Sequence, residues 1–281
     1  MRLNPFDTSK IDVGSRGGGV GKAGGIGCGT IVIAALGYFV FGLDPMQTAA
    51  TVEGMQQGQA TQSAGTQDEQ ALCTANEYAR ETCNALTSLN ETWARTFQQQ
   101  GLGDQFQTPG LDFVSGRFNT ECGPASSGLG PFYCPADQRI YIDTSFYDQL
   151  AQMAGNGGDF ARLYVVAHEY GHHVQTITGI SGQIRSAQQA NPRQANQLNV
   201  LMELQADCYA GVWAGKNRNL IEPGDIEEGM QAAAAIGDDR LTGGRVSSEN
   251  FTHGTSEQRS QALRLGLQGD DRACDRITAI S

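Results

Sequence analysis

The residues best suited to chemistry lie in one short segment, Val165 to Val174, which contains the arrangement His-Glu-x-x-His. His168 and His172 are four residues apart, so on a helix both imidazoles project from one face toward a single ion. Neutral imidazole nitrogens are common ligands of Zn²⁺. Glu169 lies at the edge of that face, where it can take a proton from water without binding the ion. The segment therefore predicts a zinc-dependent hydrolase.

Three of the four histidines of the chain lie in this segment, and most of the residues around them are apolar. A histidine buried on an apolar helix needs a polar partner, and a metal ion supplies one. The alternative is a core helix whose histidines are satisfied by protein groups. We do not expect His173 to be a ligand, because zinc usually takes the pair that is four residues apart.

A catalytic zinc site needs a third protein ligand and an open coordination position. The segment 201–213 is helical in pattern and mostly apolar, yet it carries Glu203 and Asp207 on one face. Two carboxylates on such a helix are costly unless they meet positive charge. We expect Glu203 to bind the metal and Asp207 to accept the second N–H of a ligand histidine. The alternative is a pair of solvent-facing acids on an amphipathic helix.

The remaining histidine, His253, stands just before a segment in which Thr255 and Gln258 fit a capping box. Partial positive charge gathers at a helix N-terminus, so His253 is placed to stabilise the oxyanion that forms when water attacks a peptide carbonyl. Arg259 is expected to orient His253 through a carboxylate, or to pair with a carboxylate nearby. The alternative for His253 is an exposed loop histidine.

The fold that must position these residues is expected to be α+β and mainly helical. Apolar residues recur at helical spacing at Leu86, Leu89, Trp93 and Phe97. Further helices are expected at about 145–153, from 159 onward, and at about 194–216, 223–236 and 255–268. The segment 139–143 is typical of a strand. The helix from 159 carries the histidine pair, and the helix 194–216 carries Glu203.

Seven cysteines are many for one domain, and six of them lie outside the apolar N-terminal stretch. An even number suggests disulfides and an oxidising compartment, with free buried thiols as the alternative. A bridge between Cys122 and Cys134 would pin a loop rich in glycine and proline. We also expect the pairs Cys73–Cys83, which requires a helix to begin after Cys73, and Cys208–Cys274. The sequence leaves the pairing beyond the first bridge open.

The N-terminal part of the chain differs from the rest. Residues 1–22 are a basic, glycine-rich tail, and residues 23–43 contain no charged side chain. At about 1.5 Å per residue that stretch just spans a ~30 Å hydrocarbon layer, which predicts a single transmembrane helix. Residues 44–70 are typical of a flexible linker to a domain at 71–281. Positive charge before the span predicts a cytoplasmic tail and an extracytoplasmic domain. A cleaved signal peptide is the alternative.

At these residues the chain resembles the bacterial "putative neutral zinc metallopeptidase" family, within the wider gluzincin metallopeptidases. The matching motifs cover the chain from Cys73 to about Cys274 and comprise 130–137 (GPFYCPAD), 141–143 (YID), 168–175 (HEYGHHVQ), 203–211 (ELQADCYAG) and 253–259 (HGTSEQR). The N-terminal span is also similar, and it places the protein in the bacterial cytoplasmic membrane with its domain on the periplasmic side.

The resemblance implies a gluzincin-like fold with a small edge-strand sheet. It implies Glu203 as third ligand, with Asp207 as its companion one turn later. It also implies that the strand at Ile140, Tyr141 and Ile142 is the edge with which a peptide substrate pairs. The chain has Gly254 where several gluzincin-type membrane proteases have proline.

Together these features predict a membrane-anchored metallopeptidase that uses one Zn²⁺ and Glu169 to hydrolyse a peptide or protein substrate. The alternatives are a non-catalytic zinc-containing module that binds a partner at the cell envelope, and a zinc hydrolase of a non-peptide wall component. A net charge of −11 disfavours nucleic acid as a partner, because phosphate backbones repel an acidic protein. The oligomeric state is left open.

Overall fold

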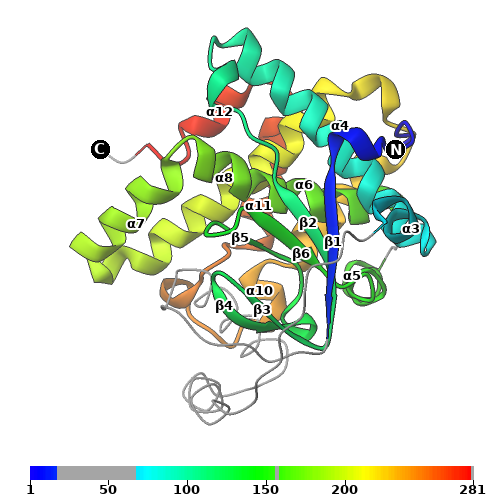
Figure 1. Ribbon diagram of the computed structural model, residues 1–281. Helices are drawn as coiled ribbons and strands as arrows, with labels where there is room; N and C mark the ends of the chain where they lie inside the picture. The colour runs from blue at the N-terminus through cyan, green and yellow to red at the C-terminus, as the bar shows by residue number, and fades with distance from the viewer. Residues whose placement is uncertain (18–67, 156–157, 280–281) are drawn as a thin grey trace.

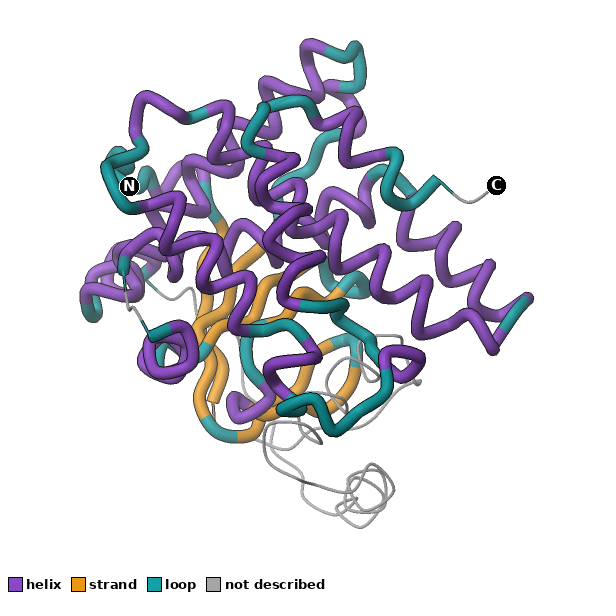
Figure 2. Tube along the Cα trace, turned by 180° about the vertical axis from the view of Figure 1, so that it is seen from behind, coloured by secondary structure: helices purple, strands orange, loops and turns teal. Residues whose placement is uncertain are grey.

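The computed structural model describes residues 1–17, 68–155 and 158–279. The strands gather in one part of the molecule and helices form the rest of it (Figures 1 and 2). The longer helices are α4 (Glu77–Gln99), α5 (Phe146–Ala154), α6 (Asp159–Ile177), α7 (Ile180–Ala190), α8 (Ala195–Lys216), α9 (Asp225–Ala235) and α11 (Ser256–Gly266). The shorter ones are α3 (Glu69–Thr74), α10 (Asp238–Leu241) and α12 (Asp271–Asp275). The expected α+β, mainly helical class is confirmed.

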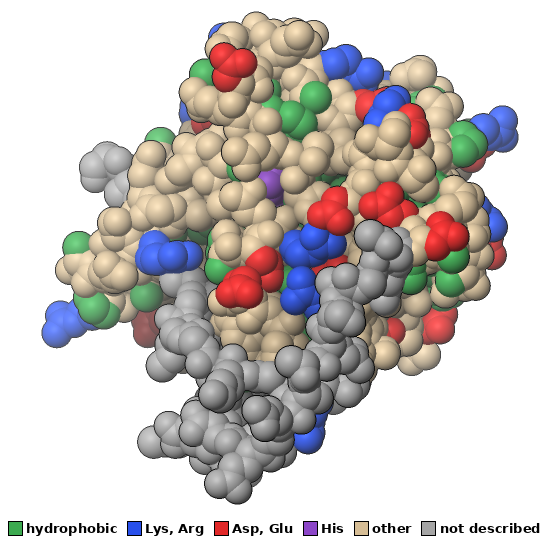
Figure 3. All heavy atoms as spheres, in the orientation of Figure 1, with side chains coloured by type: hydrophobic (Ala, Val, Ile, Leu, Met, Phe, Trp, Pro, Cys, Tyr) green, Lys and Arg blue, Asp and Glu red, His purple; other side chains and the backbone are tan. Residues whose placement is uncertain are grey.

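The main sheet has four strands in the order β1-β2-β6-β5, which are Asp12–Gly17, Gly110–Ser115, Arg139–Ile142 and Phe132–Cys134. The first three run parallel, and β5 is antiparallel to β6. Arg139 of β6 forms ion pairs with Asp12 of β1 and Asp112 of β2. Figure 3 shows acidic and basic side chains side by side on one face of the molecule. A separate hairpin joins β3 (Arg117–Thr120) to β4 (Gly123–Ser126).

The helical part is built around α8, which packs against α6, α7 and α11. In α4 the expected apolar face is present, and Leu86, Leu89, Trp93 and Phe97 are all buried. Full burial of one such side chain stabilises the fold by roughly 1.5–3 kcal/mol. The capping box predicted from Thr255 and Gln258 begins α11, as expected.

The three expected disulfides are confirmed as Cys73–Cys83, Cys122–Cys134 and Cys208–Cys274. Cys73 lies in α3 and Cys83 in α4. The helical conformation is interrupted between them, and the side chain of Asn76 caps the N-terminus of α4. The break brings the two Cα atoms to 5.8 Å, which one continuous helix would not allow. The Cys208–Cys274 bridge ties α8 to α12.

Residues 1–17 are part of the folded domain, which corrects the expectation of a separate tail at 1–22. β1 pairs along its whole length with β2, and Val13 is buried. The amino group of Met1 lies 2.9 Å from a carboxylate oxygen of Asp159 and 2.9 Å from one of Asp225. The basic and glycine-rich composition concealed a strand that gains its partner from residues far along the chain.

The membrane prediction also needs correction. None of the helices within the described ranges is both long enough and apolar enough to cross a membrane. The predicted transmembrane helix at 23–43, and the predicted linker as far as residue 67, lie outside the described residues. Residues 1–17 share a sheet with the domain, so one span between them cannot place the two on opposite sides of a bilayer. The expectation of a single-pass protein of the bacterial cytoplasmic membrane with a periplasmic domain is therefore wrong.

Candidate metal centre

Two antiparallel helices, α6 and α8, bring the predicted ligands together. His168 lies opposite Asp207, and His172 lies opposite Glu203, one turn along each helix. The helices approach closely at Gly171, where an added Cβ would lie 2.8 Å from the Cα of Ala206. A larger residue at Gly171 would force the helices apart, and with them the donor atoms. The glycine inside the His-Glu-x-x-His segment therefore sets the width of the site.

The donor set matches the prediction of His168, His172 and Glu203. One ligand atom from each of the three residues lies within 4.8 Å of the other two. The Nε2 atoms of His168 and His172 are 3.2 and 3.5 Å from the two carboxylate oxygens of Glu203. Glu203 and His168 are buried, whereas His172 is partly exposed to a groove. Two imidazoles and one carboxylate are a donor set that suits zinc.

A buried charge network holds His168 from behind. Its Nδ1 atom lies 2.8 Å from Asp207 Oδ1, as predicted for Asp207. Arg259 in turn donates two hydrogen bonds to Asp207, at 2.8 and 2.9 Å, and Tyr164 donates a third. Burial alone would lower the pKa of His168, but Asp207 and Glu203 raise that pKa to about 10. The negative charge that favours a proton on His168 also favours a metal cation, so the two compete.

His172 is oriented by neutral groups. Its Nδ1 atom lies 2.8 Å from Oε1 of Gln175, one turn along the same helix. The amide of Gln175 donates to the carbonyl of Met202 and to the side chain of Gln205, both on α8. Gln175 and Gln205 are fully buried, so this chain of amides holds the ring in one orientation. Gln175 is not among the functional residues predicted from the sequence.

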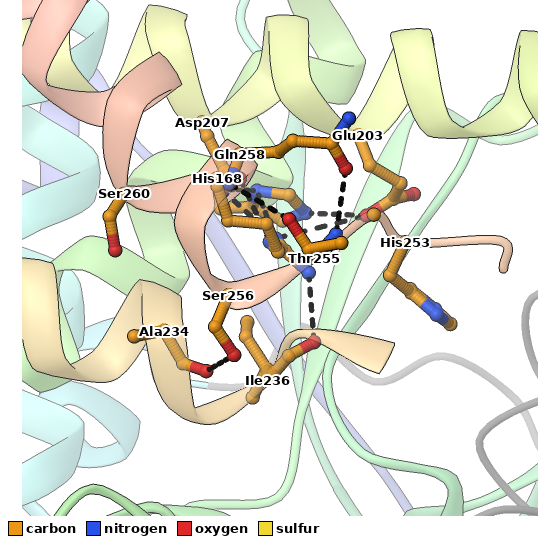
Figure 4. A network of polar contacts seen from close by, with 12 residues as sticks. His168, Glu203, Asp207, Ala234, Ile236, His253, Thr255, Ser256, Gln258 and Ser260 are labelled. Carbon is orange, nitrogen blue, oxygen red and sulfur yellow. Dashed lines mark hydrogen bonds and ion pairs between the residues drawn. The ribbon is translucent and has the colours of Figure 1, made fainter. Parts of the chain in front are cut away.

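His253 lies on the loop before α11, on the Glu203 side of the site and away from Asp207 (Figure 4). Its Nδ1 atom is 3.0 Å from Oδ1 of Asp238, whose other oxygen accepts the backbone N–H groups of Thr252, His253 and Gly254. The Nε2 atom is buried and has no hydrogen-bond partner among the described residues. His253 borders the groove, so this nitrogen is available to a bound molecule.

Arg259 and Gly254 also lie near the site, and the structure shows the contacts of the first and the backbone conformation of the second. Arg259 does not orient His253; it pairs with Asp207, the second of the two roles expected for it. The residue that orients His253 is Asp238, which sequence reasoning missed. Gly254 has φ +86°, a backbone conformation that proline cannot adopt. Proline at this position would therefore require a different path of the loop.

The groove passes over the three donors and is bordered by Glu169. Glu169 is 8% exposed, follows His168 directly, and borders the groove beside His172 and His253. Burial raises the pKa of the Glu169 carboxyl above its ordinary value. A carboxylate whose proton affinity is raised in this way is a better base than one in free solution. The position thus fits the predicted role of proton acceptor.

The strand predicted to pair with a peptide substrate, β6, is not an edge of the sheet. Ile140, Tyr141 and Ile142 are buried in β6, an inner strand that pairs with β2 on one side and with β5 on the other. The outer strands of the sheet within the described residues are β1 and β5, and Phe132 and Tyr133 of β5 border the groove. β5 lies in a segment rich in glycine and proline, a pattern typical of a loop. An extended peptide can pair with β5 but not with β6.

His173 stays outside the donor set, as predicted. It is fully buried, and its Nε2 atom is 2.7 Å from the carbonyl oxygen of Gln107, so that nitrogen carries the proton. Nδ1 therefore accepts a hydrogen bond from the hydroxyl of Tyr133, at 3.1 Å. Burial lowers the pKa of His173 to about 4. The neutral ring ties the helix of the metal ligands to the edge strand.

Comparison with known proteins agrees with this geometry. The sequence profile of a family described as "putative neutral zinc metallopeptidase" matches residues 6–277. The uncharacterized protein YpfJ of Escherichia coli K12 is 42% identical over 249 residues, which cover 86% of this chain and 83% of that protein. The uncharacterized protein Rv2575 of Mycobacterium tuberculosis is 44% identical over 191 residues, covering 62% and 64%. No solved structure matches the chain significantly.

Proposed function

Because the chain belongs to the zinc metallopeptidase family whose profile matches residues 6–277, we propose that it hydrolyses peptide bonds in the groove above His168, His172 and Glu203. The observation that carries the proposal is the convergence of these three donors beside a buried carboxylate, Glu169, that borders the same groove. A site that only stabilised the fold would have no need of such a base.

The residues present fit one zinc ion. Two neutral imidazole nitrogens and a carboxylate are the ligands of many catalytic zinc sites, and each of the two imidazoles here has an orienting partner at its other nitrogen. When bound, zinc supplies a Lewis acid that polarises a carbonyl and lowers the pKa of water. His168, His172 and Glu203 would hold the ion.

The remaining steps belong to the side chains that face the groove. Glu169 takes a proton from the attacking water and passes it to the leaving amine. Nδ1 of His253 is hydrogen-bonded to Asp238, which leaves Nε2 to donate a hydrogen bond to the oxygen of the attacked carbonyl as negative charge develops there. The edge strand β5 offers main-chain groups that hold an extended peptide across the site.

The test uses the full chain, because residues 1–17 are part of the sheet. Zinc-loaded wild-type protein and Glu169→Gln are incubated with a diverse peptide library, and products are identified by mass spectrometry. We expect cleavage by the wild type, retention of zinc but loss of turnover in Glu169→Gln, and loss of both zinc and turnover in His168→Ala and His172→Ala.

Each other outcome has a definite meaning. Full activity of Glu169→Gln would remove Glu169 as the base. A wild-type protein that binds zinc but cleaves no peptide would contradict the proposal and favour the binding module or a non-peptide substrate. Cleavage that persists after chelation of the metal would point to a contaminating enzyme, because the three ligands leave no metal-free route.

A further inference from the structure

The groove has two chemically different halves, one on each side of the metal ligands. From this asymmetry, and resting on the proposed peptidase activity, we propose that the substrate is an extended peptide with a large uncharged apolar side chain at one position flanking the cleaved bond. The opposite flanking position takes a polar side chain. The selective element is the half of the groove that lies toward the N-terminus of α6.

The direction of α6 and α8 defines the two halves. Val165 lies one turn before His168 and Glu169 on the same face of α6, and Thr176 lies one turn after His172. Because α8 runs antiparallel to α6, Asn199, one turn before Glu203, lies on the Thr176 side. All three residues border the groove. A peptide bond at the metal ligands therefore has its neighbouring residues over different surroundings.

The half toward the N-terminus of α6, here called the apolar half, contains Val165. We assign four further groove residues to it, because α5 and α9 pack together beside that end of α6: Phe146, Met153, Ile236 and Leu241. Ile236 is placed there by Arg259, which donates both to its carbonyl and to the hydroxyl of Tyr164. Gln149 also borders this half and is exposed. No Asp, Glu, Lys or Arg side chain lines it among the described residues, apart from the metal site itself and Arg259, which Asp207 neutralises.

The opposite half, here called the polar half, is lined by Thr176, Ser181, Arg185, Gln188 and Asn199. The first turn of α7 follows directly after α6, so these residues form one continuous wall. Ile184 and Met202 also border it, so the wall is mixed and not uniformly hydrophilic. Its charged member, Arg185, is exposed and can meet a polar or acidic side chain.

Met153 is an exposed residue at which the role of the apolar half can be tested. Among the described residues, the large hydrophobic side chains classed as exposed are Met153, 36% exposed, and Ile226, 45% exposed. Met153 borders the groove, whereas Ile226 does not. An exposed thioether at the mouth of an apolar site remains available to cover part of a bound side chain, and its flexibility lets it fit different shapes. Ile226 is therefore the natural control for Met153.

The energetic consequence is a preference at one flanking position only. A large side chain that enters the apolar half loses its contact with water, whereas a charged one would leave water without gaining a partner. Differences of a methylene or a few in such a pocket change kcat/KM by about 10- to 200-fold. We expect Phe or Leu to exceed Ala and Asp by that order at one flanking position, with a flat or polar preference at the other.

The experiment varies the two flanking positions of a cleaved peptide separately and compares wild type, Met153→Glu and Ile226→Glu as full chains loaded with zinc. Met153→Glu should lower kcat/KM for the Phe and Leu peptides by about tenfold or more and should shift the preference toward Lys at that position. Ile226→Glu should leave the profile unchanged. Both substitutions are at exposed positions, so folding is expected to persist.

A binding measurement separates the two levels of the proposal. Fluorescence anisotropy of labelled peptides on Glu169→Gln should show the same asymmetry in Kd, which Met153→Glu in that background removes. Wild-type protein that cleaves peptides with equal preference at both positions, or a Met153→Glu profile equal to wild type, would overturn this inference alone. Absence of both cleavage and peptide binding in a zinc-loaded protein would instead overturn the proposed function.

Discussion

Two imidazoles of the site are each backed by a buried carboxylate, but the carboxylates are held by different means. Asp207 behind His168 lies between helices and is neutralised by Arg259, another side chain. Asp238 behind His253 lies at the start of the short α10 and is held by three backbone N–H groups. The first pair depends on a second charge elsewhere in the fold, whereas the second is stabilised by the local path of the chain.

The difference fits the two roles. A metal ligand must stay in one place, and a network spanning α6, α8 and α11 fixes His168 relative to all three helices. A group that stabilises charge developing in a substrate needs a nitrogen with no hydrogen-bond partner of its own, and Nε2 of His253 has none among the described residues. Two histidine–carboxylate pairs of similar geometry are thus suited to different proposed roles, one in metal binding and one in the reaction. Four substitutions test this difference.

The largest effect is expected from Asp207→Ala. This variant removes the carboxylate that accepts two hydrogen bonds from the fully buried guanidinium of Arg259, and breaking a buried ion pair in this way costs about 3–5 kcal/mol. Loss of an orienting carboxylate also weakens metal binding, by roughly 10–100-fold. Urea unfolding and zinc titration measure the two effects. In the double variant Asp207→Ala/Arg259→Met, stability should recover while zinc affinity stays low; recovery of both would show that Asp207 does not orient His168.

The next effect is expected from His253→Ala. Removing one donor to an oxyanion lowers kcat by roughly 10²–10³. Zinc content should not change, because His253 is not one of the three donors. Steady-state kinetics together with metal analysis check this. A variant that loses zinc in proportion to its activity would show that His253 acts on the metal and not on the reaction.

Asp238→Asn should act in the same direction but less strongly. The amide oxygen can still accept backbone N–H groups, while the charged oxygen that is hydrogen-bonded to Nδ1 of His253 is replaced by a neutral NH₂ group. A hydrogen bond to a charged group contributes about 1.5–3 kcal/mol, so kcat should fall by roughly 10–100-fold with little change in KM. If Asp238→Asn reduces the activity of His253→Ala further, the two residues do not act as one unit.

The smallest effect is expected from Tyr133→Phe, which tests an imidazole with no carboxylate at all. The variant keeps the ring and removes the hydroxyl that donates to His173. The loss of one neutral hydrogen bond is worth about 0.5–1.5 kcal/mol. Because Tyr133 is in β5, we expect KM for extended peptides to rise by several-fold while zinc content is unchanged. An equal rise for a minimal dipeptide substrate would argue against a role of β5 in peptide binding.

The donors of the site could be predicted from the sequence because their information is local. His168 and His172 share a helical face by spacing alone, and Glu203 and Asp207 repeat the same spacing on an apolar helix. Asp238 has no such signature. It is fifteen residues from His253 along the chain, and only the turn after α9 brings the two together. An acid in a polar segment gives no sign that it will be buried.

The sheet was harder to predict than the helices for a related reason. A strand is recognised by alternation, and β5 has three residues beside proline and glycine, while β1 is mostly polar. Both strands owe their conformation to partners outside their own sequence. The membrane prediction rested on composition and separated residues 1–17 from the domain. The structure shows that these residues pair with β2 of that domain.

The pairing of β1 with β2 has a consequence for the order in which the protein folds. Asp12 lies opposite Gly110, so this ladder closes a very long loop, whereas β5 and β6 meet across a short turn. Closing a longer loop costs more entropy, and long-range parallel pairing forms slowly. We expect pulsed hydrogen exchange during refolding to protect β6 amides before those of β1. Residues 12–17 would then be among the last to find their partner, although they precede the rest of the sheet in the sequence.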